Sequence, residues 1–314
     1  MGAGHRPVML AEVLAALEPG RGGLYVDGTV GAAGHAAALL TASAPAGLLL
    51  GLDRDPQALQ SARRQLEPYA DRVRLVEATF DHIGDELQAW GRGPADGILL
   101  DLGVSSMQLD QAARGFSFRQ DAPLDMRMSG RGESAAQLLA RLGEDELARL
   151  LARLGEEPFA RRIARALAAA QGEEPIATTG RLAELVSAAL PAAERRRRKL
   201  HPATQVFQAL RLAVNDELGM LERFLEQAPR WLAPGGRLAV LCYHSLEDRR
   251  VKQAVSRWAR PCTCPPGLPV CACGRRPLFT PLGRLRRPRP QEVEDNPRAR
   301  SARLRAALRT QEAA

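Results

Sequence analysis

The chain has 314 residues, of which 45% are apolar and 25% are charged, as in an ordinary globular protein with a hydrophobic core. It has no uncharged apolar run of about 18 residues, so we expect no membrane-spanning helix. The N-terminal "MGAGHRPVMLAEVL" lacks a signal-peptide pattern, and we therefore expect a cytoplasmic protein. The net charge of +8 suits a polyanionic partner.

Strand and helix signals alternate over the first hundred residues. "GLYVDGTV", "GLLLGLDRDP", "RVRLVEATF" and "DGILLDLG" predict four buried strands, and helical segments separate them. Strands that are apolar on both faces are typical of a mostly parallel sheet with helices on both sides. The sequence therefore predicts a doubly wound α/β fold, because crossover connections between parallel strands are right-handed.

The pattern changes after Phe118. Residues 133–189 show only helical periodicity, divided by glycines, and a further long helical pattern covers residues 203–232. "PGGRLAVLCYHS" then predicts a turn and a buried strand, so the helical block is an insertion into the sheet domain. "ARSARLRAAL" fits either a closing strand or a short helix.

Two basic runs lie in the second half of the chain. The first, "ERRRRKLHP", covers residues 194–202. From Arg275 to Arg309, eleven arginines stand against three acids. Each run alone fits a solvated surface, but together they favour nucleic acid as the partner.

The first predicted strand ends at Asp27 and enters a turn framed by Gly31 and Gly34. Small residues allow a ligand to approach the backbone, and the following helix offers free N–H donors. Asp53 ends the second strand, 22 positions after Gly31. An acid at this distance from the glycine turn is placed to accept hydrogen bonds from ribose hydroxyls. Asp53 could instead cap the next helix, but Asp55, directly before Pro56, fits that role better.

Two further strand ends carry candidate ligand contacts. Asp101 ends the fourth strand, where a carboxylate can accept a hydrogen bond from an amino group. Phe80 follows the third strand and could pack on a purine, although core packing explains it equally well. These features imply a nucleotide-bearing cofactor, and both nicotinamide dinucleotides and S-adenosylmethionine satisfy them.

Longer motifs narrow this choice. "YVDGTVGAAGH", "DGILLDLGVSSMQLDQAARGFSFRQDAPLDMRM", "HPATQVFQALRLAVNDEL", "LAPGGRLAVLCYHSLEDRRVK" and "NPRARSARLRAA" occur in this order. From His5 to Ala306 the chain resembles the bacterial 16S rRNA cytosine-N4 methyltransferases, the ribosomal RNA small subunit methyltransferase H family.

The resemblance implies a class I methyltransferase with a Rossmann-like sheet and S-adenosyl-L-methionine as the cofactor. The expected substrate is the exocyclic N4 of a cytidine in the decoding region of 16S rRNA, within the small ribosomal subunit. We expect a discontinuous methyltransferase domain, residues 1–109 and 198–314, and an inserted helical substrate-recognition domain, residues 110–197. Monomer and homodimer both remain open.

By motif position, the resemblance also assigns the cofactor site. The implied residues are Ala33, Gly34, His35, Asp53, Phe80, Asp101 and Gln108. Relatives commonly carry glycine where this chain has Ala32 and Ala33, so we expect φ values there that alanine tolerates.

Asp101 is also the candidate catalytic residue, as an acceptor facing the reacting amine, although a role in cofactor binding alone is at least as well supported. In "RGFSFR", Phe116 and Phe118 are candidates for stacking on the target base, with Arg119 for phosphate. Alternatively, these rings anchor the loop to the helical domain.

Four cysteines form a C-x-C-x6-C-x-C pattern at Cys262, Cys264, Cys271 and Cys273. We expect no disulfide framework without a secretion signal and no metal in the reaction. The C-x-C spacing is less usual for zinc than C-x2-C, so zinc remains the minor alternative for this cluster.

Two other functions deserve weight. A DNA amino-methyltransferase would carry an N/D-P-P-aromatic motif after the fourth strand, where this chain has "DLGV". A non-catalytic RNA-binding factor would not need both Asp53 and Asp101.

Overall fold

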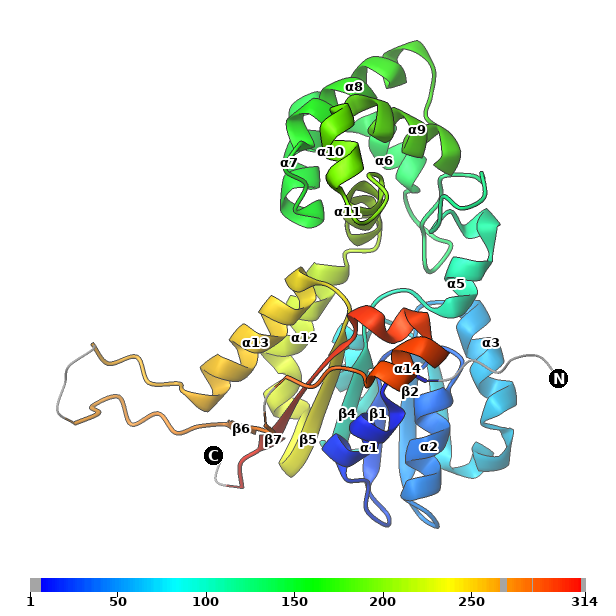
Figure 1. Ribbon diagram of the computed structural model, residues 1–314. Helices are drawn as coiled ribbons and strands as arrows, with labels where there is room; N and C mark the ends of the chain where they lie inside the picture. The colour runs from blue at the N-terminus through cyan, green and yellow to red at the C-terminus, as the bar shows by residue number, and fades with distance from the viewer. Residues whose placement is uncertain (1–6, 266–269, 284, 312–314) are drawn as a thin grey trace. The chain divides into compact units, whose positions relative to one another are not determined.

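The structure is a computed structural model that describes residues 7–265, 270–283 and 285–311. The chain forms two compact units, one of Met1–Gly103 with Leu218–Ala314 and the other of Val104–Glu217 (Figure 1). Among the described residues, no helix combines the length and the apolar character that crossing a membrane requires. Residues 1–6, which begin the segment without a signal-peptide pattern, lie outside this description.

The first unit is built on a seven-stranded sheet. Its strands are β1 (Leu24–Asp27), β2 (Leu48–Asp53), β3 (Val73–Glu77), β4 (Ala95–Asp101), β5 (Leu232–Cys242), β6 (Phe279–Pro281) and β7 (Arg303–Arg309). The order across the sheet is β3-β2-β1-β4-β5-β7-β6, and the antiparallel pairings are those of β7 with β5 and with β6. The predicted doubly wound, mostly parallel sheet is therefore confirmed, and "ARSARLRAAL" supplies a strand.

Helices cover both faces of this sheet, as Figure 1 shows. One hydrophobic cluster joins the strands to α4 (Ile83–Ala89), α12 (Glu217–Trp231) and α13 (Ser245–Ala259). The other joins them to α1 (Leu10–Leu17), α2 (Gly34–Ala42), α3 (Pro56–Gln65) and the 3-10 turn η4 (Pro297–Ser301). Burial on both faces explains why the central strands β2 and β4 are mostly apolar and do not alternate.

The cap of α3 follows the sequence closely. The Asp55 carboxylate accepts a hydrogen bond from the Gln57 N–H at 3.0 Å, and Pro56 occupies the first helical position. Asp55 is therefore the helix cap, as predicted, and this leaves Asp53 for another role.

The second unit is helical. Its helices are α5 (Ser106–Asp110), α6 (Ala135–Arg141), α7 (Glu144–Gly155), α8 (Ala160–Glu173), α9 (Thr179–Ala189), α10 (Ala192–Arg197) and α11 (Thr204–Val214). Between α7 and α8 the buried Glu157 carboxylate accepts hydrogen bonds from the Arg198 guanidinium at 2.6 and 2.8 Å. A buried, bidentate ion pair of this kind fixes the chain entering α11.

The long helical pattern over residues 203–232 is not one helix. It breaks between α11 and α12, where Asp216 has a φ of 47°. At the break, the buried Asn215 side chain accepts from the Met128 N–H at 2.9 Å and donates to the Met126 carbonyl at 2.8 Å. Hydrogen bonds to a distant loop thus replace the helix here, which periodicity alone does not reveal.

Strand β1 ends on a carboxylate that is almost completely buried. Asp27 is 1% exposed, and its Oδ1 accepts a hydrogen bond from the Thr29 N–H at 3.2 Å. Burial raises the pKa of Asp27 to about 7, the Thr29 N–H opposes this rise, and the charges of Asp101 and Asp53 add to it. The fold therefore concentrates negative charge at this edge of the sheet.

This raised pKa makes stability depend on pH. Because the pKa in the folded state lies above the unfolded value of 3.8, the folded protein binds the proton more tightly. Asp27 therefore lowers the free energy of unfolding as pH rises from about 4 to about 7. Above that range the whole of this destabilisation is present. A tenfold difference in proton affinity between the folded and unfolded states corresponds to about 1.4 kcal/mol.

Asp27→Asn, which stays neutral and keeps an acceptor for Thr29, should be more stable than the wild type at about pH 8, with an advantage that shrinks toward about pH 5. Denaturant unfolding across this pH range measures the difference. The exposed Asp71→Asn serves as the control and should leave the wild-type pH profile unchanged. An advantage of Asp27→Asn that stays constant with pH would rule out this ionisation as its cause.

Candidate active site

Three carboxylates lie at the carboxyl ends of three adjacent strands. Asp53 ends β2, Asp27 ends β1 and Asp101 ends β4, and the sheet order places β1 between the other two. Open parallel sheets bind ligands beyond this edge. The sheet thus brings Asp53 and Asp101, both predicted from the sequence, to the same edge.

Asp53 holds the glycine turn that follows β1. Its Oδ2 accepts from the Gly31 N–H at 2.9 Å, and its Oδ1 accepts from the Asp55 N–H at 2.9 Å. Burial raises the pKa of Asp53 to about 6, and these two N–H groups oppose the rise. A carboxylate has about four acceptor positions, so hydroxyl groups of a ligand can also bind here.

The turn itself departs from the prediction at Ala33. The expected φ tolerated by alanine is wrong for this residue, because Ala33 has a φ of 67° at the N-terminus of α2. The Ala33 N–H donates to the Val30 carbonyl at 2.7 Å, and this tight turn imposes the left-handed conformation. Alanine in this region costs about 1–2 kcal/mol, which the surrounding contacts offset. Gly34 follows as the first residue of α2.

His35, one residue further along α2, is buried and has a defined tautomer. Its Nε2 lies 3.0 Å from the Val8 carbonyl oxygen, which can only accept, so Nε2 carries a proton. Its Nδ1 lies 3.8 Å from the Asp101 carboxylate. His35 therefore links the segment before α1 to the acid at the end of β4.

Asp101 also bonds to residues that follow the strands on both sides. Its Oδ1 accepts a hydrogen bond from the Tyr243 hydroxyl at 2.7 Å, and its N–H donates to Thr29 Oγ1 at 2.6 Å. Burial, with Asp101 nearby, raises the pKa of Tyr243 well above its usual value, so the phenol remains a donor. The carboxylate is thereby held in one orientation.

Sequence reasoning missed Tyr243. The available signal is its position directly after the apolar strand β5, which parallels the positions of the acids at the ends of the other strands. The Glu247 carboxylate accepts from the Tyr243 N–H at 2.8 Å at the start of α13, which fixes the backbone there.

Phe80 lies shortly after β3, close to the same edge. It is 8% exposed, and its ring meets Phe224 edge to face at 6.0 Å between centroids. The ring thus packs in the core of the sheet unit, and contact with a bound purine stays a prediction.

The remaining predicted residues lie in the helical unit. Gln108 is buried at the start of α5, where it forms a capping box with Ser105. Phe118 is half-buried and packs on His201 and Phe207, at 4.6 and 4.8 Å between ring centroids. Phe116 is 9% exposed, with the Arg114 guanidinium 5.9 Å from its ring centre, and Arg119 is exposed.

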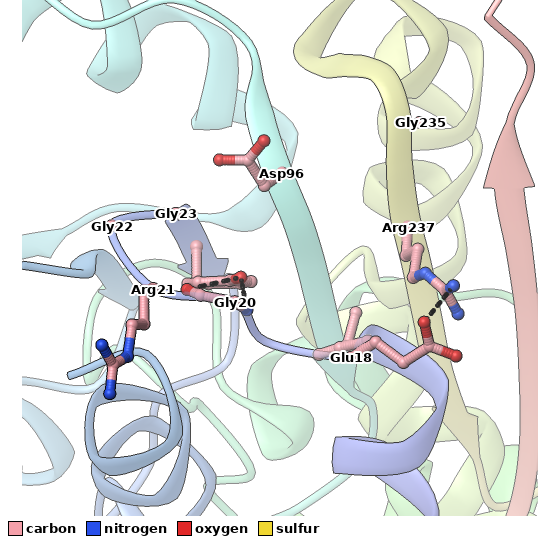
Figure 2. A pocket seen from close by; sticks show the side chains of 10 residues that line it. Glu18, Gly20, Arg21, Gly22, Gly23, Asp96, Gly235 and Arg237 are labelled. Carbon is pink, nitrogen blue, oxygen red and sulfur yellow. Dashed lines mark hydrogen bonds and ion pairs between the residues drawn. The ribbon is translucent and has the colours of Figure 1, made fainter.

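A cavity of about 450 Å³ lies at the opposite edge of the sheet (Figure 2). Gly20, Gly22, Gly23 and Asp96 line it, and the Arg237 guanidinium pairs there with Glu18. This cavity contains none of the candidate residues. Ligands of open α/β sheets bind at the carboxyl ends of the strands, so the edge with the three carboxylates is the candidate active site.

Comparison with known proteins shows the family of this chain. Residues 2–310 match the model of the MraW methylase family. The chain is 53% identical to ribosomal RNA small subunit methyltransferase H of Symbiobacterium thermophilum, over 98% of this chain and 97% of that protein. Proteins of the same name from Heliobacterium mobile and Geobacter sulfurreducens are 50% and 52% identical, over 96% of this chain and 98% of each relative. The chain therefore belongs to the MraW methylase family.

Proposed function

We propose that this protein transfers a methyl group from S-adenosylmethionine to the N4 amine of a cytidine in the decoding region of 16S rRNA. The relative from Symbiobacterium thermophilum carries the proposal, because 53% identity over nearly the whole chain favours a shared substrate. The basic runs support an rRNA partner within the small subunit, and such a substrate places the enzyme in the cytoplasm.

The residues at the carboxyl edge of the sheet fit this cofactor. Burial raises the pKa values of Asp27 and Asp53, and the charges of neighbouring carboxylates raise both further. A ligand that brings positive charge and hydroxyl donors relieves this repulsion. S-Adenosylmethionine, when bound, supplies a cationic sulfonium with an electrophilic methyl group and a ribose with two hydroxyls. We assign the ribose to Asp53 and the rest of the cofactor site in the sheet unit to Ala33, Gly34, His35, Phe80 and Asp101. A cofactor contact of Gln108 stays a prediction from the resemblance.

The target amine needs help from the protein. The N4 lone pair of cytosine is delocalised into the ring, so the amine is a weak nucleophile. The N4–C bond would form as the methyl–sulfur bond breaks, so that the electron pair of the broken bond stays on sulfur as a neutral thioether. Positive charge grows on N4, which then loses one proton to solvent. We propose that the Asp101 carboxylate accepts a hydrogen bond from this amine and stabilises that charge. Tyr243 acts as a positioning residue, because its hydroxyl orients the carboxylate through a hydrogen bond and does not contact the amine.

The helical unit then serves substrate recognition. Phe118 is partly exposed beside His201, and the exposed Arg119 is adjacent in sequence. A splayed base can stack on such a ring while the guanidinium binds phosphate. Phe116 is more deeply buried, so we propose that it supports the loop that carries Phe118.

The product of the reaction tests the proposal directly. Small subunits from cells that lack this protein should accept labelled methyl groups, and digestion should yield N4-methylcytidine as the labelled nucleoside. Naked rRNA and duplex DNA are run in parallel to separate the substrate classes. Label on any other nucleoside, or preferential labelling of DNA, would contradict the proposed activity.

Asp101→Ala tests the chemical role. We expect turnover at saturating cofactor to fall by about 10²-fold or more, with a much smaller loss of cofactor affinity in calorimetry. Asp96→Asn alters the other end of the same strand and should leave both quantities unchanged. If the weaker binding of cofactor accounts for the whole loss of activity, Asp101 is a cofactor ligand only.

Phe118→Ala tests the stacking role. Loss of a base–aromatic contact worth about 1–3 kcal/mol should lower kcat/KM on small subunits roughly 5- to 150-fold. Cofactor affinity and the unfolding midpoint serve as controls for the cofactor site and for the packing on Phe207. Full activity, or a loss of activity that matches a loss of folded protein, would leave Phe118 as an anchor of the loop.

A further inference from the structure

We propose that Cys262, Cys264, Cys271 and Cys273 bind one Zn²⁺ ion as a structural site between α13 and β6. These thiols lie in the sheet unit, on the segment that leaves the end of α13 and returns to β6 (Figure 1). The proposal does not depend on methyl transfer, and none of the candidate active-site residues belongs to this segment.

The four sulfur atoms are already gathered. All lie within 4.8 Å of one another. Cys271 Sγ lies 3.5 Å from Cys262 Sγ, 3.8 Å from Cys264 Sγ and 3.4 Å from Cys273 Sγ. A tetrahedral zinc ion with Zn–S bonds of about 2.3 Å requires sulfur atoms about 3.8 Å apart. Small shifts of the side chains therefore suffice to surround one ion.

The same distances argue against disulfide bonds. A disulfide requires sulfur atoms about 2.05 Å apart, and two disulfides would divide the four atoms into two pairs. Here all four cysteines are free thiols, and Cys271 has three neighbours at similar distances. This arrangement is typical of a metal centre.

The backbone around the cluster favours thiolates. Backbone N–H groups of Arg275 and Thr263 donate hydrogen bonds to the Cys273 sulfur. The Cys264 N–H likewise donates a hydrogen bond to the Cys262 sulfur. Several adjacent thiols cannot all ionise without a cation, and Zn²⁺ supplies that charge as the remaining protons leave. Arg260, Arg275 and Arg276 lie close to the cysteines in the sequence, which suits the net negative charge of a four-thiolate zinc site.

The segment between α13 and β6 also lacks a hydrophobic core of its own and needs a cross-link. At its base, the Leu278 N–H donates to the Trp258 carbonyl at 2.9 Å, and the Trp258 and Phe279 rings lie 4.7 Å apart. Beyond this base, none of the described residues between 261 and 277 is buried, and Val270 is 77% exposed. Without a hydrophobic core, a metal ion is the source of order that the residues present can provide.

Metal analysis of the full-length protein, purified without chelators, tests the site. We expect about one zinc ion per chain, released in step with the reaction of four thiols when a mercurial reagent is titrated in the presence of a chromogenic chelator. Co²⁺ exchanged into the site should give the absorption of a tetrahedral thiolate complex.

Two variants make the assignment specific. Cys271→Ser should lose the zinc and leave the unfolding midpoint of the sheet unit nearly unchanged, because the segment lies outside the core. Cys242→Ala removes the buried thiol of β5 and should retain one zinc ion per chain. Zinc-free protein with four reactive thiols after incubation with excess Zn²⁺, a mass lower by four hydrogens from two disulfides, or full zinc content in Cys271→Ser would each overturn the proposal.

Discussion

The hydrogen bonds that tie the turn after β1 to the two neighbouring strands are the constraint on which the site depends. Asp53 of β2 accepts the Gly31 N–H, and Thr29 accepts the N–H of Asp101 at the end of β4. The turn is thus fixed from both sides before any ligand arrives. This fixed geometry makes the left-handed Ala33 tolerable and orients the N-terminus of α2.

Charge is distributed unevenly over this protein. The chain carries a net charge of +8, yet three carboxylates converge at one edge of its sheet. The excess arginines suit a long polyanion, while the acids suit a small cationic ligand and a developing positive charge. Under the proposed function, the basic runs and the locally acidic site would each suit a different partner, the RNA and the cofactor.

Sequence patterns predicted those residues of the site whose position follows from a single strand and the turn after it. Asp53, Asp101 and the Asp55 cap follow from apolar strands that end in acids, and the sheet topology follows from strands without alternation. The contact of Tyr243 with Asp101 could not be predicted, because it requires β5 to lie beside β4 in a particular register. The break at Asn215 has the same origin, since its hydrogen-bond partners Met126 and Met128 lie far earlier in the chain.

The position of β7 has a consequence for how the protein is made. Residues 303–309 fit between β5 and β6, although they are synthesised after both. Until they emerge from the ribosome, the nascent chain exposes the hydrogen-bonding edge of β5, the strand that leads into Tyr243. Such an open edge invites pairing with other chains. The sheet is therefore complete only when residues 303–309 have paired with β5 and β6, and this pairing covers the edge of β5.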